Sequence, residues 1–505
     1  MDIVQRLTQA QAQARTTSCV QYEQSSVVNV MPGDIVGSIL AEPLAAQVAV
    51  EISDLPNELL ATIFAELVTE RWPSHPERVL TIVCSRWRSV AMHTPALWAA
   101  ISVVPDQSIQ LIKTYLGRSC NQPLDLYFEW WIDEGIWKGP LRQRLAVLMS
   151  YSRRWRRLSL TKMNARNIHS VLSRVNHLGY LPQLTHLTVH KNVAIEEFRH
   201  CFPFIAAIST PALTELDISI ARMKGLYKSF HFDSLTHLTL RPTHGRLADW
   251  RIFKRLLTSL RTLEYLQLEG DVVEFDEAHL DIIIGNPRYG IVEIPTLRTL
   301  ILKTETLEQF HSILMGIFAF DLRHLELFHP GDEDEEHVGV GSTLGVAGIY
   351  FYDILGNQFT EVTSLCLHNW MDPTFSRGST FLPAFPRVEH IRFDGYDIDN
   401  FSFALLMESR RTESRPFLAQ LKSITLSHPT DDQLMICLFT VELWFTPWNG
   451  YRAPLILCVC SPRGQSWSQE VCVVSERLGR DGVAVVNFSD EDRECLARGT
   501  CNPPR

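Results

Sequence analysis

Apolar residues recur with a helical period in a segment that starts near residue 52. Ser53 and Asp54 suit an N-cap and Pro56 suits a first helical turn, so a helix is expected after them. The breaker WPSHPE follows, and the same period then returns and predicts a second helix. Leu97 and Trp98 offer a third apolar patch that closes a compact helical hairpin. The periodic positions are Leu59, Leu60, Ile63, Phe64 and Leu67, then Val79, Leu80, Val83, Cys84, Trp87 and Val90.

A second pattern, L-x-x-L-x-L, recurs from about Trp155 onward, and random leucine content does not produce such a series. One strand, turn and helix unit cannot bury its own apolar face, whereas stacked units place their leucines in a shared interior. The sequence therefore predicts an α/β fold in which an all-α helical module precedes an irregular solenoid, a parallel strand ladder with helices outside. The copies are RWRRLSL (154–160), LTHLTV (184–189), LTELDI (213–218), LTHLTL (235–240), LEYLQL (263–268), LRTLIL (297–302), LRHLEL (322–327), VTSLCL (362–367), VEHIRF (388–393) and LKSITL (421–426).

The segments between several copies have helical spacing, and the repeat length varies from roughly 22 to 40 residues. This irregularity predicts a ragged arc with insertions. An acidic run followed by a Gly-rich run, GDEDEEH and GVGSTLGVAG, is typical of an exposed insertion loop. The expected helices lie at 198–208, 250–260, 307–318 and 401–409.

Side chains alternate along a strand, so the residues between the leucines point away from the interior. We expect them to line one concave surface that binds a protein. The histidines among them are open to a second interpretation, a pH-sensitive or metal-binding strip, but the carboxylates and arginine between them favour recognition. The predicted residues are His186, Glu215, Asp217, His237, Tyr265, Gln267, His324, Glu326, His368, His390 and Arg392.

These patterns divide the chain into five segments. They are a flexible lead (1–50), the helical module (51–104), a linker into the repeats (105–153), the solenoid (154–427) and a C-terminal segment (428–505). The leucine motif stops in the last segment, which we interpret as a cap for the array, a small appended element or a poorly ordered tail.

Composition narrows the class of partner. Hydrophobic residues make up 46% and charged residues 21% of the chain, as in ordinary globular proteins. The net charge of −10 provides no basic field for nucleic acid. No stretch approaches the roughly 20 apolar residues of a membrane span, and the N-terminus lacks the features of a secretory signal. We therefore expect a cytoplasmic or nuclear protein with reduced cysteines and no nucleic-acid or membrane partner.

Several short segments resemble catalytic or ligand-binding motifs but lack residues or spacings that those sites need. The Gly-rich run lacks the Lys-Ser/Thr of a phosphate-binding loop. The arginines around Trp155 form an isolated basic cluster on an acidic chain, and Cys458-x-Cys460 with Cys472 lacks the paired spacing of a zinc site. No catalytic triad can be assigned from residue order. We expect no enzymatic activity, no metal and no cofactor.

The segment from Ile52 to Val103 resembles an F-box of the fungal F-box-like type. Its matching positions are Leu55-Pro56, Glu58-Leu59, Ile63-Phe64, Val83-Cys84, Trp87-Arg88, Pro95, Leu97 and Trp98. The following part is similar to the leucine-rich-repeat half of F-box and leucine-rich-repeat proteins, including the Arg-Trp-Arg segment at 154–156. The insert TERWPSHPER between the first two helices departs from the common F-box pattern.

This resemblance implies a substrate-recognition subunit of an SCF-type (cullin-RING) ubiquitin ligase. Its F-box would dock on the Skp-type adaptor and its repeats would hold an unidentified protein substrate. A helical hairpin of about 50 residues is also too small to bury all its large apolar side chains. The alternatives are a leucine-rich-repeat scaffold without a ligase role and an enzyme with its site near the C-terminus. The expected adaptor contacts are Leu55, Pro56, Glu58, Leu59, Ile63, Phe64, Val83, Cys84, Trp87 and Trp98.

Overall fold

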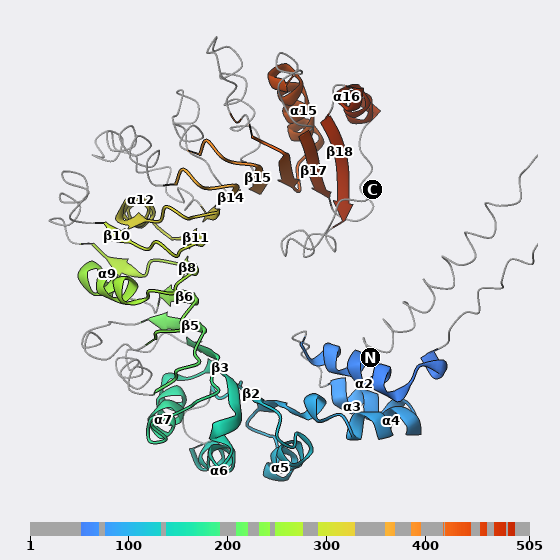
Figure 1. Ribbon diagram of the computed structural model, residues 1–505, viewed down its shortest axis with the longest axis vertical. Coiled ribbons are helices and arrows are strands. Elements are labelled where there is room, and N and C mark those ends of the chain that lie inside the picture. Colours follow the sequence, from blue (N-terminus) through green and yellow to red (C-terminus); the bar gives the residue numbers. More distant parts are fainter. Residues whose placement is uncertain are drawn as a thin grey trace, which may run out of the picture. The chain divides into compact units, whose positions relative to one another are not determined.

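The computed structural model is mixed α/β and divides into two compact units, residues 1–126 and 127–505 (Figure 1). The expected lead at 1–50, the expected helices at 198–208 and 401–409, and the expected acidic and Gly-rich loop all lie outside the described residues. The structure describes residues 52–69, 76–132, 138–191, 209–220, 232–242, 248–275, 291–328, 359–368, 385–394, 418, 420–445, 455–461, 469–480 and 483–489.

The first unit is mainly helical. Asn57 opens its first long helix directly after Pro56, and Ser108 caps another by accepting a hydrogen bond from the Leu111 backbone N–H. Its elements are η1 (Ile52–Asp54), α2 (Asn57–Thr69), α3 (Pro76–Val83), α4 (Ser85–Met92), η2 (Pro95–Trp98), β1 (Ala100–Val103) and α5 (Ile109–Arg118). Strand β2 (Leu124–Phe128) runs across the boundary with the second unit.

The second predicted helix of this unit is two helices, which corrects the sequence-based expectation. Cys84 separates α3 from α4 with extended backbone angles, φ −155° and ψ 171°. Its Sγ accepts a hydrogen bond from the Trp87 backbone N–H at 3.4 Å and so caps α4. The apolar period continues across this break because both helices bury a face in the same core, so periodicity alone does not reveal it.

The second unit contains a long parallel ladder, in which neighbouring strands follow one another in chain order. Figure 1 shows these strands stacked in sequence, with α9 and α12 to the left of them. The strands of the ladder are β3 (Trp155–Met163), β4 (His186–Lys191), β5 (Glu215–Ile220), β6 (His237–Pro242), β8 (Tyr265–Glu269), β11 (Thr299–Lys303), β13 (His324–Phe328), β14 (Ser364–His368), β15 (His390–Asp394), β16 (Ser423–Ser427), β17 (Leu455–Ser461) and β18 (Val483–Ser489).

The motif leucines form continuous buried rows across the ladder, as predicted. Leu266, Leu300 and Leu325 lie in register on neighbouring strands and are each 0% exposed. The last leucines of the same motifs, Leu302 and Leu327, form a second buried row. This identical register from strand to strand keeps alternate side chains on opposite faces throughout.

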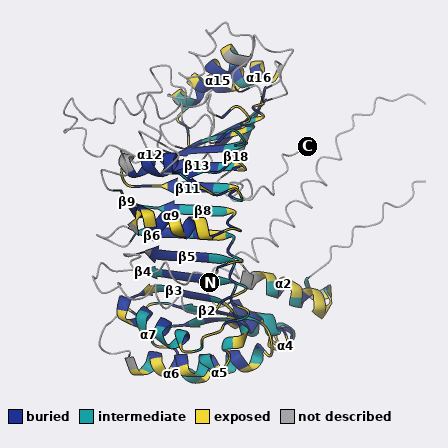
Figure 2. Cartoon of the chain, turned by 60° about the vertical axis from the view of Figure 1, so that its left-hand side comes forward, coloured by how far each residue is buried: buried dark blue, intermediate teal, exposed yellow. Residues whose placement is uncertain are grey.

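The helices of the second unit include two at predicted places, at 250–260 and 307–318. Helix α9 (Trp250–Ser259) alternates buried and exposed residues in Figure 2, and α12 (Leu307–Gly316) is capped by the Thr306 hydroxyl, which accepts from the Gln309 backbone N–H. The remaining described elements are α6 (Lys138–Met149), η3 (Ser152–Arg154), α7 (Ala165–Asn176), β7 (Ala248–Asp249), β9 (Val273–Glu274), β10 (Val292–Glu293), β12 (Ile317–Phe318), α15 (Asp431–Phe445) and α16 (Gln469–Arg480).

The ladder extends beyond the last leucine motif. Strands β17 and β18 pair in parallel with β16 and with each other, and α15 and α16 come between them in the chain. Two further strand-and-helix units therefore lie within 428–505. In the described part of the chain, no helix is both long and apolar enough to cross a membrane.

Candidate interaction surfaces

The first unit exposes apolar side chains along α2 and at the end of α3. Leu59 and Ile63, one helical turn apart on α2, are 51% and 43% exposed. Ile82 and Val83 at the end of α3 are 74% and 47% exposed. We call these four residues the apolar patch of the first unit. Large apolar side chains left exposed in this way are candidates for contact with a protein partner.

The start of α4 is held against the segment that precedes α2. The Arg86 guanidinium donates hydrogen bonds to the Leu55 carbonyl and, at 3.0 Å, to the Asn57 side-chain oxygen. The Trp87 ring packs on Phe64 with 5.0 Å between ring centroids. These contacts bring Leu55 to the N-terminal end of α4, although the two segments are about 30 residues apart in sequence.

The structure divides the ten expected adaptor contacts into surface and core. Phe64 and Trp98 are only 1% and 3% exposed, and the Trp98 indole N–H donates to the Ala91 carbonyl at 2.9 Å. These two side chains stabilise the unit and do not contribute to its surface. Of the others, Leu55 and Trp87 are half-buried, and Pro56, Glu58, Leu59, Ile63, Val83 and Cys84 are exposed.

A buried polar contact holds α3 to α5. The Tyr115 hydroxyl donates to Glu77 Oε1, and both residues are almost fully buried. Burial, together with the negative charge of Glu77, raises the pKa of Tyr115 above its ordinary value. The Trp98 ring packs edge-on against Tyr115, and the Arg118 guanidinium lies 4.3 Å from the centre of the Trp98 ring. The core beneath the apolar patch is therefore complete without a partner.

The second unit presents polar side chains on the face of the ladder opposite the leucines. We call this the polar face and define it by alternate residues of β4 to β16. Strand register arranges them in three rows. The first row runs His186, Glu215, His237, Tyr265, Thr299, His324, Ser364, His390 and Ser423; the second runs Thr188, Asp217, Thr239, Gln267, Ile301, Glu326, Cys366, Arg392 and Thr425. The third includes Ser219, Arg241, Glu269, Lys303, Phe328, His368, Asp394 and Ser427.

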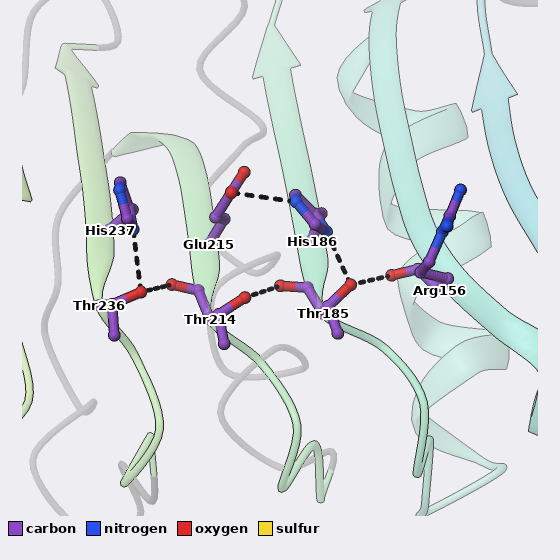
Figure 3. A network of polar contacts seen from close by, with 7 residues as sticks. All are labelled: Arg156, Thr185, His186, Thr214, Glu215, Thr236 and His237. Carbon is purple, nitrogen blue, oxygen red and sulfur yellow. Dashed lines mark hydrogen bonds and ion pairs between the residues drawn. The ribbon is translucent and has the colours of Figure 1, made fainter. Parts of the chain in front are cut away.

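Threonines at the beginning of each strand connect the first repeats. The Thr236 hydroxyl donates to the Thr214 carbonyl, and the Thr214 hydroxyl donates to the Thr185 carbonyl, both at 3.1 Å (Figure 3). The Thr185 hydroxyl continues the series to the Arg156 carbonyl at 3.1 Å. The carbonyls of Thr185 and Thr214 each also accept two backbone N–H groups from the next repeat. These hydroxyls fix the spacing at which the polar face begins.

His186 makes two polar contacts beside this threonine series. Its Nδ1 lies 2.7 Å from the Thr185 hydroxyl oxygen. The other ring nitrogen, Nε2, lies 3.0 Å from Glu215 Oε1 (Figure 3). These two contacts fix the orientation of the imidazole ring beside the Glu215 carboxylate.

The Asp217 carboxylate has two nitrogen groups close to it, one from His190 and one from Arg241. His190 Nε2 lies 2.8 Å and Arg241 Nε 3.1 Å from Asp217 Oδ1, and Arg241 also pairs with Glu269. Burial alone would raise the pKa of Asp217, but His190 and Arg241 hold the pKa below its ordinary value. The carboxylate is therefore ionised and its charge is neutralised within the face.

Tyr265 lies at the centre of the face and is hydrogen-bonded along its own strand. Its hydroxyl donates to Gln267 Oε1 at 2.6 Å, and Gln267 Nε2 donates to Glu269 Oε1 at 2.7 Å. The His237 ring stacks on the Tyr265 ring with centroids 5.3 Å apart. Burial and the charges of Glu326 and Asp217 raise the pKa of Tyr265 to about 12, so its hydroxyl is a neutral donor.

Glu326 binds two histidines from different parts of the chain. His368 Nε2 lies 2.9 Å from Oε1, and His324 Nε2 lies 3.6 Å from Oε2. Burial opposes ionisation of Glu326, but the hydrogen bonds of these two imidazoles lower its pKa to about 2. The His368 ring also stacks on Phe328, with centroids 3.9 Å apart and planes within 3°. The ring orientation of His368 is therefore fixed from two sides.

The remaining predicted residues of the face lie on β15. The His390 side chain is 53% exposed and its Nδ1 is 2.7 Å from Ser423 Oγ. The partial burial of its ring lowers its pKa, Glu389 opposes this effect and Lys422 adds to it. Arg392 is half-buried. All eleven residues that the sequence predicted for this surface lie on the polar face, with His368 the most buried of them at 8%.

Several residues that form these surfaces were not predicted from the sequence. Arg241, Glu269, Lys303 and Phe328 occupy the third row, one alternation beyond the last motif leucine. Continuing the period-two pattern by one more step would have found them. The threonines that bond backwards between repeats were detectable as the second residue of LTHL and LTEL.

The described side chains of the polar face provide charge pairs and stacked rings. Among the described residues, no group of three or more His, Cys, Asp or Glu side chains is placed to hold a metal ion. Compared with protein-family models and with curated proteins, the chain matches none of them.

Proposed function

We propose that this chain is a substrate-recognition subunit of an SCF-type ubiquitin ligase, in which the first unit is an F-box and the ladder is a leucine-rich-repeat array. The apolar patch of the first unit would bind the Skp-type adaptor, and the polar face of the second unit would bind the protein substrate. The ubiquitin transfer itself would be performed by other subunits.

The observation that carries the proposal is the exposed apolar patch on a helical unit with a complete core. Phe64, Trp98 and Tyr115 fill that core, whereas the four residues of the patch leave from 43% to 74% of their surface open to solvent. Burying a whole aliphatic side chain contributes about 1.5–3 kcal/mol. Residues that are half exposed thus retain about 1 kcal/mol each for a partner. Such a surface fits the resemblance of residues 52–103 to an F-box.

The polar face supports the second half of the proposal. Its carboxylates are paired within the face, as in His186–Glu215, Asp217–Arg241 and His368–Glu326. Pairing holds the side chains in fixed positions, which lowers the entropy cost of binding a protein. Rings at Tyr265 and Phe328 provide stacking surfaces among the charges.

The test is the affinity of the purified full chain for the Skp-type adaptor. Replacing Leu59 and Ile63 together by Ala removes the α2 half of the patch and should weaken binding at least tenfold. The matched control replaces Ile436 and Leu443 of α15, which are 48% and 56% exposed, and should leave binding unchanged. Equal affinity in wild type and the Leu59/Ile63 variant would refute the proposal and favour a scaffold without a ligase role.

A further inference from the structure

Two arginines lie on the polar face between β4 and β16, and their surroundings differ. Arg241 on β6 bonds to Asp217 and Glu269 from both sides. Arg392 on β15 occupies the middle row, between Cys366 and Thr425. Among the described residues it forms no ion pair, and its Nε is buried without a hydrogen-bond partner. In this part of the structure it is thus a half-buried cation without an ion-pair partner among the described side chains.

A second polar group without a partner lies on the adjacent strand. Ser427 is 0% exposed, and its hydroxyl has no hydrogen-bond partner in the described structure. Arg392 pairs in register with Thr425, so Ser427 lies one diagonal step away on the same face. A buried donor without an acceptor destabilises a protein, and a charged donor does so more strongly. The Arg392 Nε–H can only donate and the Ser427 hydroxyl is able to donate, so both groups have an N–H or O–H for which the described structure shows no acceptor.

The neighbouring cations are not available to an incoming anion. Lys422 Nζ bonds to Glu389 Oε2 at 2.6 Å, and His390 has a lowered pKa and bonds to Ser423. Arg392 therefore supplies the positive charge at this place.

We propose that Arg392 is an anion-binding position of the polar face, which takes a carboxylate or phosphate group of the bound protein. The planar guanidinium matches two oxygens of either group and gains two charge-assisted hydrogen bonds. A neutral carbonyl would satisfy the Nε but leave the charge uncompensated. This inference rests on the proposed function, because the anion is taken to belong to the substrate that the polar face binds.

The Arg392 side chain itself reports the binding. In the full chain labelled with ¹⁵N-arginine, the buried Nε–H of Arg392 should give a resolved NMR signal, assigned by its loss in Arg392→Gln. Sodium acetate and sodium phosphate are titrated separately at constant ionic strength, with sodium chloride as reference. We expect a saturable shift of this signal with acetate, with phosphate or with both. A shift with acetate alone indicates that the site binds a carboxylate of the substrate. A shift with phosphate alone indicates that it binds a phosphorylated side chain.

A second arginine separates a binding site from a general salt effect. The signal of the Nε–H of Arg323, an exposed arginine paired with Glu361, should not shift at the same anion concentrations. Absence of a shift with both anions, or equal shifts at Arg323 and Arg392, would overturn the inference.

A peptide measurement then connects the site to protein recognition. For short peptides that carry one Glu, one phosphoserine or one Gln, the anion favoured by Arg392 should bind at least tenfold more weakly to Arg392→Gln. Adaptor affinity is measured on the same preparations and should be unchanged, because Arg392 lies in the second unit. If the chain binds the adaptor but Arg392→Gln binds the anionic peptide as tightly as wild type, only this inference is overturned. If the peptide affinity depends on Arg392 but the wild-type chain does not bind the adaptor, only the ligase proposal is overturned.

Discussion

Glu326 provides a pH-dependent test of the polar face. Its pKa of about 2, against an ordinary 4.5, means that the folded protein keeps this carboxylate ionised where the unfolded chain protonates it. A lowered pKa stabilises the fold above about pH 4.5, and the stabilisation is lost as the pH falls towards about 2. Replacing Glu326 by Gln removes the charge and with it this dependence.

The magnitude follows from the same values. A fall in pKa from 4.5 to about 2 corresponds to roughly 3 kcal/mol. The Glu326 side chain is 23% exposed, and solvent screening reduces the expected contribution to about 2 kcal/mol. Glu326→Gln should therefore lower the free energy of opening of β13 and β14 by about 2 kcal/mol at pH 5.5, where ordinary histidines are mostly protonated.

Hydrogen exchange with mass spectrometry measures this opening locally. Wild type and Glu326→Gln are compared at pH 5.5, 4.5 and 3.5. The difference between their free energies of opening at β13 and β14 should become smaller as the pH falls. The control Glu264→Gln alters an exposed residue just before β8 and should change the free energy by less than about 0.5 kcal/mol at each pH. Equal free energies of opening at pH 5.5, or a difference that does not change with pH, would show that ionised Glu326 does not stabilise these strands.

Three further substitutions test other contacts. Tyr115→Phe removes the hydrogen bond to the buried Glu77 and should destabilise α3 and α5 by about 1.5–3 kcal/mol, measured by hydrogen exchange; unchanged protection would contradict it. Thr214→Val removes one link between repeats and should cost about 1 kcal/mol, with faster exchange at the start of β5. Gly316→Ala places a methyl group 2.6 Å from the Trp250 ring and should lower the melting temperature through overpacking of about 1–3 kcal/mol, whereas an unchanged melting temperature would show that the ring moves freely.

The strand ladder was predictable because its signal is repeated. Each L-x-x-L-x-L copy is weak alone, but Leu266, Leu300 and Leu325 all belong to copies and fall into one buried row. The C-terminal strands carry no such signal. In β17 the run LILCVCS is apolar at consecutive positions, and Cys458 and Cys460 are buried at positions in register with the polar face. With no alternation to detect, the sequence did not indicate where the ladder ends.

The composition of the polar face was predictable, but its pairings were not. Alternation assigns Glu326 to the face, whereas its partners are decided by register with strands elsewhere in the chain. His368, the nearer partner, is 42 residues away, and nothing in the local sequence associates the two. The same limit applies in the first unit, where helical period selects Phe64 and Leu59 equally. Only the packed structure shows that Phe64 is core and Leu59 is surface.

The central claim is that the first unit binds the adaptor of a ubiquitin ligase. The most direct measurement is size-exclusion chromatography with light scattering on a mixture of the purified full chain and the Skp-type adaptor. If the first unit is an F-box, the mixture should contain one complex with the summed mass of one full chain and one adaptor molecule. We also predict that replacing Leu55 and Pro56 by Ala, a loss of about 2 kcal/mol or more, makes the two proteins elute separately at low concentration. Separate elution of the wild-type chain and the adaptor, or an unchanged complex in the double variant, would contradict it.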